Sequence, residues 1–199
     1  MALPTSFTMP DGSVYDLDHM QRMNSAVSVT VNGKRYRIPV VVIFSTHCYT
    51  DGKNGTVKMT DNLYFHTDNT GHRAFCEERY NTSLKLPDRV RNMIEESGAC
   101  YKLDKASNYV HLHDQGKPDK WRGWYVLFTF DRSKAGEPVA LRVSITSYHY
   151  RMKKPDNLRW TGSFKFPALV AEWLRNREDV LQQFPEIVDD AGTGAVKPP

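Results

Sequence analysis

One β-hairpin near the N-terminus constrains the fold more than any other feature of the sequence. Residues 25–31, SAVSVTV, alternate small or polar side chains with apolar ones. Asn32-Gly33 follows, a dipeptide typical of the tight two-residue hairpin turn. Residues 34–45, KRYRIPVVVIFS, return as the second strand. The period of two then places these apolar side chains on one face: Tyr36, Ile38, Val40, Val42 and Phe44. The hairpin predicts a sheet packed onto a core.

Two further features of the returning strand refine this prediction. Val41 and Ile43 are apolar on the opposite face, so the end of the strand is expected to be buried on both sides. Pro39 has no N–H to donate, which favours either an edge position or a bulge at mid-strand.

Helical spacing appears in two later regions. Cys76, Tyr80 and Leu84 recur at intervals of four, which predicts a helix from Arg73 onward with these three on one face. A second helix is expected over 87–97, PDRVRNMIEES, with a proline in its first turn. The amphipathic stretch 166–184, FPALVAEWLRNREDVLQQF, predicts a C-terminal helix.

Strand patterns fill the region between these helices. Residues 100–114 contain one strand or a hairpin, 121–132 are rich in aromatic β-formers, and 137–151 alternate most regularly. Because helices and strands are segregated along the chain, the predicted class is α+β. We expect an antiparallel sheet with an N-terminal hairpin, two central helices and a C-terminal helix. The predicted organisation is a loosely structured arm over 1–25, one α+β domain over 26–184 and a disordered tail over 185–199.

Composition narrows the setting in which the protein works. Three cysteines, an odd number without a CxxC spacing, argue against a disulfide framework and favour a reducing compartment. No apolar run approaches the roughly 18 residues that span a bilayer, and no signal peptide is visible. We therefore expect a cytoplasmic protein without a membrane partner. The formal net charge of +4 is compatible with a polyanionic partner such as nucleic acid.

The stretch IFSTHCYTDG, residues 43–52, ends the hairpin with two reactive residue types. Histidine is a common general base, which makes His47 a candidate for that role, and Cys48 could serve as a nucleophile or metal ligand. The alternative is a strand end that carries a buried thiol. Because neighbouring residues on a strand point to opposite faces, His47 and Cys48 are not expected to act on each other.

The strand at 141–151, LRVSITSYHYR, offers a polar face followed by cations. Alternation places Leu141, Val143 and Ile145 toward the core. The opposite row is Arg142, Ser144, Thr146 and Tyr148, and Arg151, Lys153 and Lys154 follow. Such a row suits a phosphate backbone, with tyrosines available for stacking on bases. The alternative is the ordinary polar outer face of an antiparallel sheet.

Two smaller groups of residues also invite a functional interpretation. Arg79 and Ser83 are four residues apart on the first predicted helix and could hold a phosphate, or could belong to a solvated helix face. His111 and His113 share one face of a strand, and whether they bind a metal stays open. No glycine-rich phosphate loop, nucleophile elbow or HExxH pattern occurs, so the sequence predicts neither a cofactor nor a metal site.

The order of elements and the final strand resemble a known superfamily. Helices followed by antiparallel strands over 73–152, ending in VSITSYHYR, are similar to the metal-independent ribonucleases that include barnase, RelE-type toxins, EndoU and the colicin ribonucleases. Many members carry a last strand of the type I-x-T-A-Y at the active-site face. The N-terminal hairpin and the C-terminal helix depart from that pattern. The stretch FSTHCYTDG also resembles uncharacterised bacterial proteins carried on plasmids and integrated elements.

This resemblance implies a set of roles for a toxin-like ribonuclease. His47 would be the base, Tyr148 or His149 the acid, and Arg79 or Arg151 the cation that stabilises the phosphorane. His149 shares the parity of Val143 and is expected on the core face. A second function class stays open: a non-catalytic protein that binds RNA, another single-stranded nucleic acid, or a protein partner such as an antitoxin. The sequence does not decide whether the protein is an enzyme.

Overall fold

The computed structural model describes residues 4–52, 64–68, 71–95, 99–103, 108–113, 122–153 and 163–187. Its main sheet has six strands in the order β3-β4-β11-β10-β9-β8. These are β3 (Met23–Val31), β4 (Lys34–Phe44), β8 (Cys100–Lys102), β9 (Asn108–His113), β10 (Gly123–Arg132) and β11 (Leu141–Arg151). Neighbouring strands are antiparallel except β4 and β11, which run parallel. The predicted α+β class, with a largely antiparallel sheet, is confirmed.

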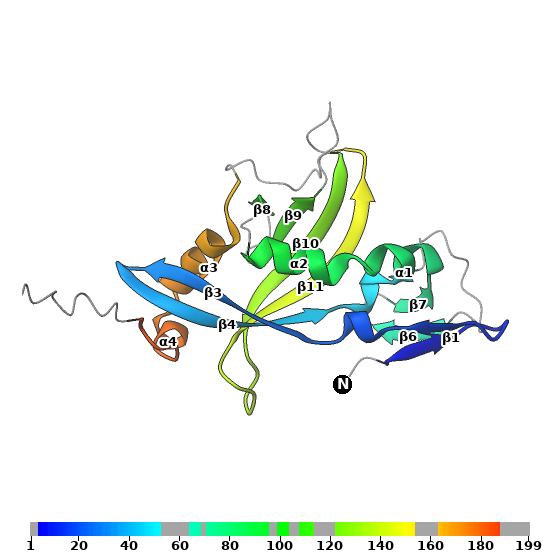
Figure 1. Cartoon of the computed structure of the whole chain (residues 1–199), viewed down its shortest axis with the longest axis horizontal. Helices are drawn as coiled ribbons and strands as arrows, with labels where there is room; N and C mark the ends of the chain where they lie inside the picture. The colour runs from blue at the N-terminus through cyan, green and yellow to red at the C-terminus, as the bar shows by residue number, and fades with distance from the viewer. Residues whose placement is uncertain are drawn as a thin grey trace, which may run out of the picture.

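The described helices lie around this sheet (Figure 1). They are α1 (Glu77–Ser83), α2 (Leu86–Glu95), α3 (Phe166–Arg175) and α4 (Glu178–Leu181), with short 3₁₀ turns η1 (Asp18–Met20) and η2 (Thr46–Cys48). Val27 and Val29 of β3 share one continuous core with Leu169 and Trp173 of α3. None of the helices in the described residues is long and apolar enough to cross a membrane.

The predicted N-terminal hairpin forms with the expected register. Val31 pairs with Lys34, which leaves Asn32 and Gly33 as the two turn residues. Both have positive φ, 51° and 79°, as a type I′ turn requires. The inner face of β4 is buried as predicted. Pro39 lies just before the ladder with β11, which begins at Val40, so its missing N–H falls outside that ladder.

Two smaller sheets lie beyond the end of β4. One pairs β1 (Ser6–Thr8) with β2 (Val14–Asp16), and the other has the order β5-β7-β6 with β5 (Thr50–Asp51), β6 (Tyr64–Asp68) and β7 (Gly71–Phe75). The expected loosely structured arm is wrong for the described part of 1–25, because Leu17 and Met20 are fully buried in the core. Strands of three residues are too short to show alternation, which explains why the sequence did not reveal them.

The predicted helices need smaller corrections. Arg73 belongs to β7, and α1 begins at Glu77. Leu84, expected on the inner face, is 48% exposed. The predicted C-terminal helix is divided into α3 and α4 around Arg177. In the expected tail, Glu186 forms a β-bridge with Tyr36, and the remainder beyond 187 lies outside the described residues.

Candidate functional site

The parallel pairing of β4 with β11 brings the His47 region beside the second half of β11. The ladder ends where Phe44 pairs with Ile145. Ser45 N–H then donates to the Ile145 carbonyl at 2.9 Å, and the chain turns into η2. The Ser45 hydroxyl accepts the His47 N–H at 3.2 Å, which caps this turn. Two segments that are far apart in the sequence therefore converge at η2.

A β-bulge then decides which side chains of β11 face this region. Leu127 of β10 pairs with Ser147, whereas the next residue, Phe128, pairs with Ile145. Thr146 is thus the extra residue, and alternation is inverted beyond it. Tyr148 lies in the core, 2% exposed, and its ring stacks on Trp124 with centroids 4.9 Å apart. The predicted placement of Tyr148 on the polar face and of His149 on the core face is therefore wrong for both residues.

His149 lies on the sheet face opposite the Tyr148 side chain. Arg151 Nε donates to His149 Nε2 at 2.5 Å, and Ser147 Oγ lies 3.1 Å from His149 Nδ1. Because Nε2 accepts a hydrogen bond, the neutral ring carries its proton on Nδ1 and donates it to Ser147. The Tyr125 ring is nearly parallel to the imidazole, with centroids 6.5 Å apart. Burial, followed by the positive charges of Arg151 and Arg79, lowers the pKa of His149 to about 4.

Arg79 of α1 connects His149 to the η2 turn. Its Nη1 donates to the His47 carbonyl at 3.2 Å, and its Nε lies 2.5 Å from Asp51 Oδ1. Asp51 is buried, so the guanidinium compensates a carboxylate that has left water. We call His47, Arg79, Ser147, His149 and Arg151 the His149 cluster. It combines two guanidinium groups with one carboxylate at its border, so its net charge is positive.

Arg73 fixes the backbone next to the η2 turn. Arg73 is buried and donates from Nε to Thr50 Oγ1 at 2.7 Å and from Nη2 to the Thr50 carbonyl at 2.9 Å. Thr50 Oγ1 in turn donates to the Thr46 carbonyl at 2.8 Å. A Cβ on Gly52 would lie 3.2 Å from Arg73 Nη1, which explains why glycine suits this position. The η2 turn is thus held on a rigid support.

Cys48 takes no part in the His149 cluster. Its thiol points into the core, 4.0 Å from the Ile145 carbonyl, and burial raises its pKa to about 12. A thiol with this pKa is not a thiolate at neutral pH, so it is poorly suited to nucleophilic attack. Cys76 and Cys100 are also buried, and burial raises the pKa of each. Cys48 is therefore the buried strand-end thiol, and His47 is the partly exposed neighbour.

Several residues predicted to bind phosphate lie elsewhere. Ser83 is buried, donates to the Tyr80 carbonyl at 2.7 Å and lies 2.8 Å from His19 Nε2, and its predicted role beside Arg79 in binding phosphate stays a prediction. Arg142 lies at the opposite end of β11, across from Asp131. Lys153 is exposed just beyond β11. Lys154 lies outside the described residues, as do the side chains of His111 and His113. The described residues contain no group of three metal-binding side chains.

Sequence reasoning missed three residues that build the site. They are Asp51 and Thr50, which received no functional interpretation, and Arg73, which was expected at the start of a helix. An Asp, an Arg and a Thr within a β-rich region carry a weak signal, because their contacts join segments more than twenty residues apart. Only the arrangement in space makes them recognisable.

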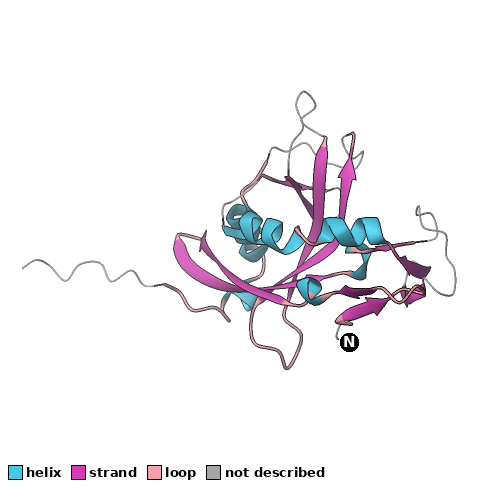
Figure 2. Ribbon diagram, turned by 45° about the vertical axis from the view of Figure 1, so that its right-hand side comes forward, coloured by secondary structure: helices cyan, strands magenta, loops and turns pink. Residues whose placement is uncertain are grey.

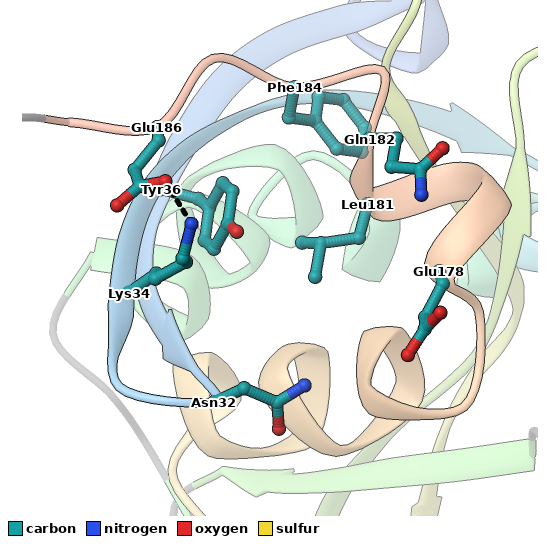
Figure 3. Close-up of a pocket in the computed structure, with 8 residues that line it drawn as sticks. All are labelled: Asn32, Lys34, Tyr36, Glu178, Leu181, Gln182, Phe184 and Glu186. Atoms are coloured by element: carbon teal, nitrogen blue, oxygen red, sulfur yellow. Dashed lines mark hydrogen bonds and ion pairs between the residues drawn. The ribbon is translucent and has the colours of Figure 1, made fainter.

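A separate hollow of about 390 Å³ lies between the hairpin turn and the C-terminal segment (Figure 3). Asn32, Tyr36, Leu181 and Phe184 contribute to its wall. Lys34 and Glu186 form an ion pair at 2.8 Å on its rim, which neutralises both charges. The hollow contains no residue of the His149 cluster, and its rim does not favour an anion.

Comparison with known proteins gives one positive result. The model of the YjaZ family matches residues 6–174, which spans the main sheet and all elements of the His149 cluster. No curated protein and no solved structure matches the chain.

Proposed function

The chain belongs to the YjaZ family, and we propose that it binds single-stranded RNA through the phosphate groups without cleaving it. The observation that carries this proposal is a neutral His149 that accepts a hydrogen bond from Arg151 and lies within the electrostatic influence of a second guanidinium group, Arg79. Arginine recognises phosphate through a planar fork of N–H donors. Its contact with His149 uses one of the five donors of Arg151.

The positions of the proposed acids argue for binding over cleavage. In metal-independent RNA cleavage the ribose 2′-hydroxyl attacks the phosphorus and the 5′-oxygen leaves, which requires an acid that holds a proton at the working pH to protonate that oxygen. Tyr148 is buried against Trp124, and His149 with a pKa of about 4 is neutral at physiological pH. The ribonuclease hypothesis retains His47 as a base, and it stays a prediction of the sequence resemblance. An acidic protein partner would be attracted by the same cations.

Replacement of one cluster arginine tests the binding proposal. We expect Arg151→Ala to weaken binding of a short fluorescent single-stranded RNA several-fold and to reduce the salt dependence by about one phosphate contact. Fluorescence anisotropy between about 50 and 200 mM salt measures both quantities. Arg175→Ala is the matched control, because Arg175 is an exposed arginine on α3 with the same charge. Absence of binding by the wild type, or equal losses in both variants, would contradict the proposal.

Cleavage is separated from binding in the same samples. The RNA is incubated with wild-type protein in a chelator and analysed on a denaturing gel. Intact RNA supports a binding protein. Cleavage that is lost in His47→Ala, while anisotropy is retained, would replace our proposal with the metal-independent ribonuclease.

A further inference from the structure

We propose that the projecting end of β10 and β11 binds nucleobases by stacking. This inference rests on the proposed binding of RNA. The His149 cluster is proposed to bind the phosphates, and this second surface would bind the bases. We call Arg122, Trp124, Tyr150 and Met152 the aromatic end. In Figures 1 and 2, β10 and β11 extend past the helices that cover the sheet, so this part of the two strands projects from the body of the protein.

The alternation of β11 puts the aromatic end and the His149 cluster on opposite sides of one strand. Beyond the bulge, Tyr148 and Tyr150 point to the helix side, whereas His149 and Arg151 point to the other. The ladder with β4 has already ended at Ile145. A phosphate held by Arg151 would therefore lie on one face of β11, and a base stacked on the neighbouring Tyr150 would lie on the other face.

The rings of the aromatic end form a graded stack from core to solvent. Tyr148 is buried and stacks on Trp124 at 4.9 Å, and Tyr150 meets Trp124 edge-on at 5.4 Å. Tyr150 is 41% exposed and Met152 is 56% exposed. Few other large hydrophobic side chains of the described residues are this exposed, and these two are next-but-one neighbours. The buried Tyr148 ring packs on Trp124, and Trp124 in turn contacts Tyr150.

Cations surround this aromatic surface and select the kind of partner. Arg122 Nε donates to the Tyr150 hydroxyl at 2.7 Å. The Arg89 guanidinium lies 5.8 Å from the Trp124 ring centroid, and Lys153 is exposed beside Met152. Asp88, which precedes Arg89 on α2, forms an ion pair with Arg91 at 2.7 Å. Flat apolar rings among cations are complementary to the bases and phosphates of a single strand.

The test compares two ligands that differ only in their bases. One is a short oligoadenylate RNA, and the other is an abasic ribose-phosphate oligomer of the same length. We expect the wild type to bind the oligoadenylate more tightly. Tyr150→Ala should weaken oligoadenylate binding about fivefold or more, the range of one lost stacking contact, and leave abasic binding unchanged. Tyr150→Phe keeps the ring and should retain most of the affinity.

Leu84→Ala is the matched control, because Leu84 is a hydrophobic side chain of similar exposure on α1. Circular dichroism and thermal melting confirm that each variant folds. If the wild type binds both ligands equally, or if Tyr150→Ala weakens both to the same extent, the stacking proposal is overturned and the binding proposal stands. If the wild type binds neither ligand, the binding proposal itself fails.

Discussion

His149 gives its name to the candidate site, and its protonation departs from the ordinary behaviour of a histidine. Its pKa of about 4 in the folded protein lies below the roughly 6.5 of an exposed histidine. Between these two values the unfolded chain binds a proton that the folded chain does not bind. The free energy of unfolding therefore falls as pH falls from about 7 toward 4, by up to about 3 kcal/mol from this residue.

Urea denaturation at about pH 7 and pH 5 measures this dependence. We expect His149→Gln, which cannot be protonated, to show a smaller loss of stability over the same interval. His19 contributes a residual dependence, because burial also lowers its pKa. An identical pH dependence in the wild type and in His149→Gln would show that the imidazole is not held neutral by its surroundings.

The bulge in β11 places Tyr148 on the core face and His149 on the opposite face, the reverse of the prediction. Thr146 itself is exposed, and its hydroxyl donates to the Leu127 carbonyl at 3.3 Å. Its side chain matters little, whereas its presence as an extra residue sets the facing of every later position on the strand. The alternation of inward and outward side chains holds only up to the extra residue, and no residue type near Thr146 predicts a bulge there. This is why the sequence predicted Val143 and Ile145 correctly and misplaced the two candidate acids.

Deletion of Thr146 tests the importance of this insertion. Deletion makes the ladder with β10 regular and leaves Tyr148 two positions after Ile145, so both side chains stay on the core face. We therefore expect a loss of no more than about 2 kcal/mol. Thr146→Ala keeps the chain length and should change the free energy of unfolding by no more than about 0.5 kcal/mol. Chemical denaturation of both variants provides the comparison. A deletion variant that fails to fold would show that the bulge itself is required for the fold.

Across the whole molecule, local contacts were predictable and distant ones were not. The hairpin of β3 and β4 depends on a two-residue turn, and α2 depends on the spacing of Val90, Met93 and Ile94, so both followed from the sequence. The parallel pairing of β4 with β11 joins residues about a hundred positions apart, and no local pattern encodes it. The His149 cluster depends on that pairing. Its existence could be hypothesised from residue types, but its membership required the fold.

The N-terminal segment shows the same principle in its effect on stability. Leu17 is fully buried in the core that also contains β3 and α3, although it lies in a stretch whose sequence suggested a loose arm. We expect Leu17→Ala to lower the free energy of unfolding by about 2–5 kcal/mol, because it removes buried methyl groups and leaves a cavity. An arm outside the core would make the same substitution nearly neutral.

Val14→Ala is the control for this experiment, since Val14 lies three residues earlier and is 66% exposed. We expect its midpoint in urea to match that of the wild type within error, while the midpoint of Leu17→Ala shifts downward with an unchanged slope. The unchanged slope matters, because it would show that the N-terminal segment unfolds together with the main sheet. Equal midpoints for both variants, or a separate early transition in Leu17→Ala, would instead indicate that β1, β2 and η1 form an independent appendage.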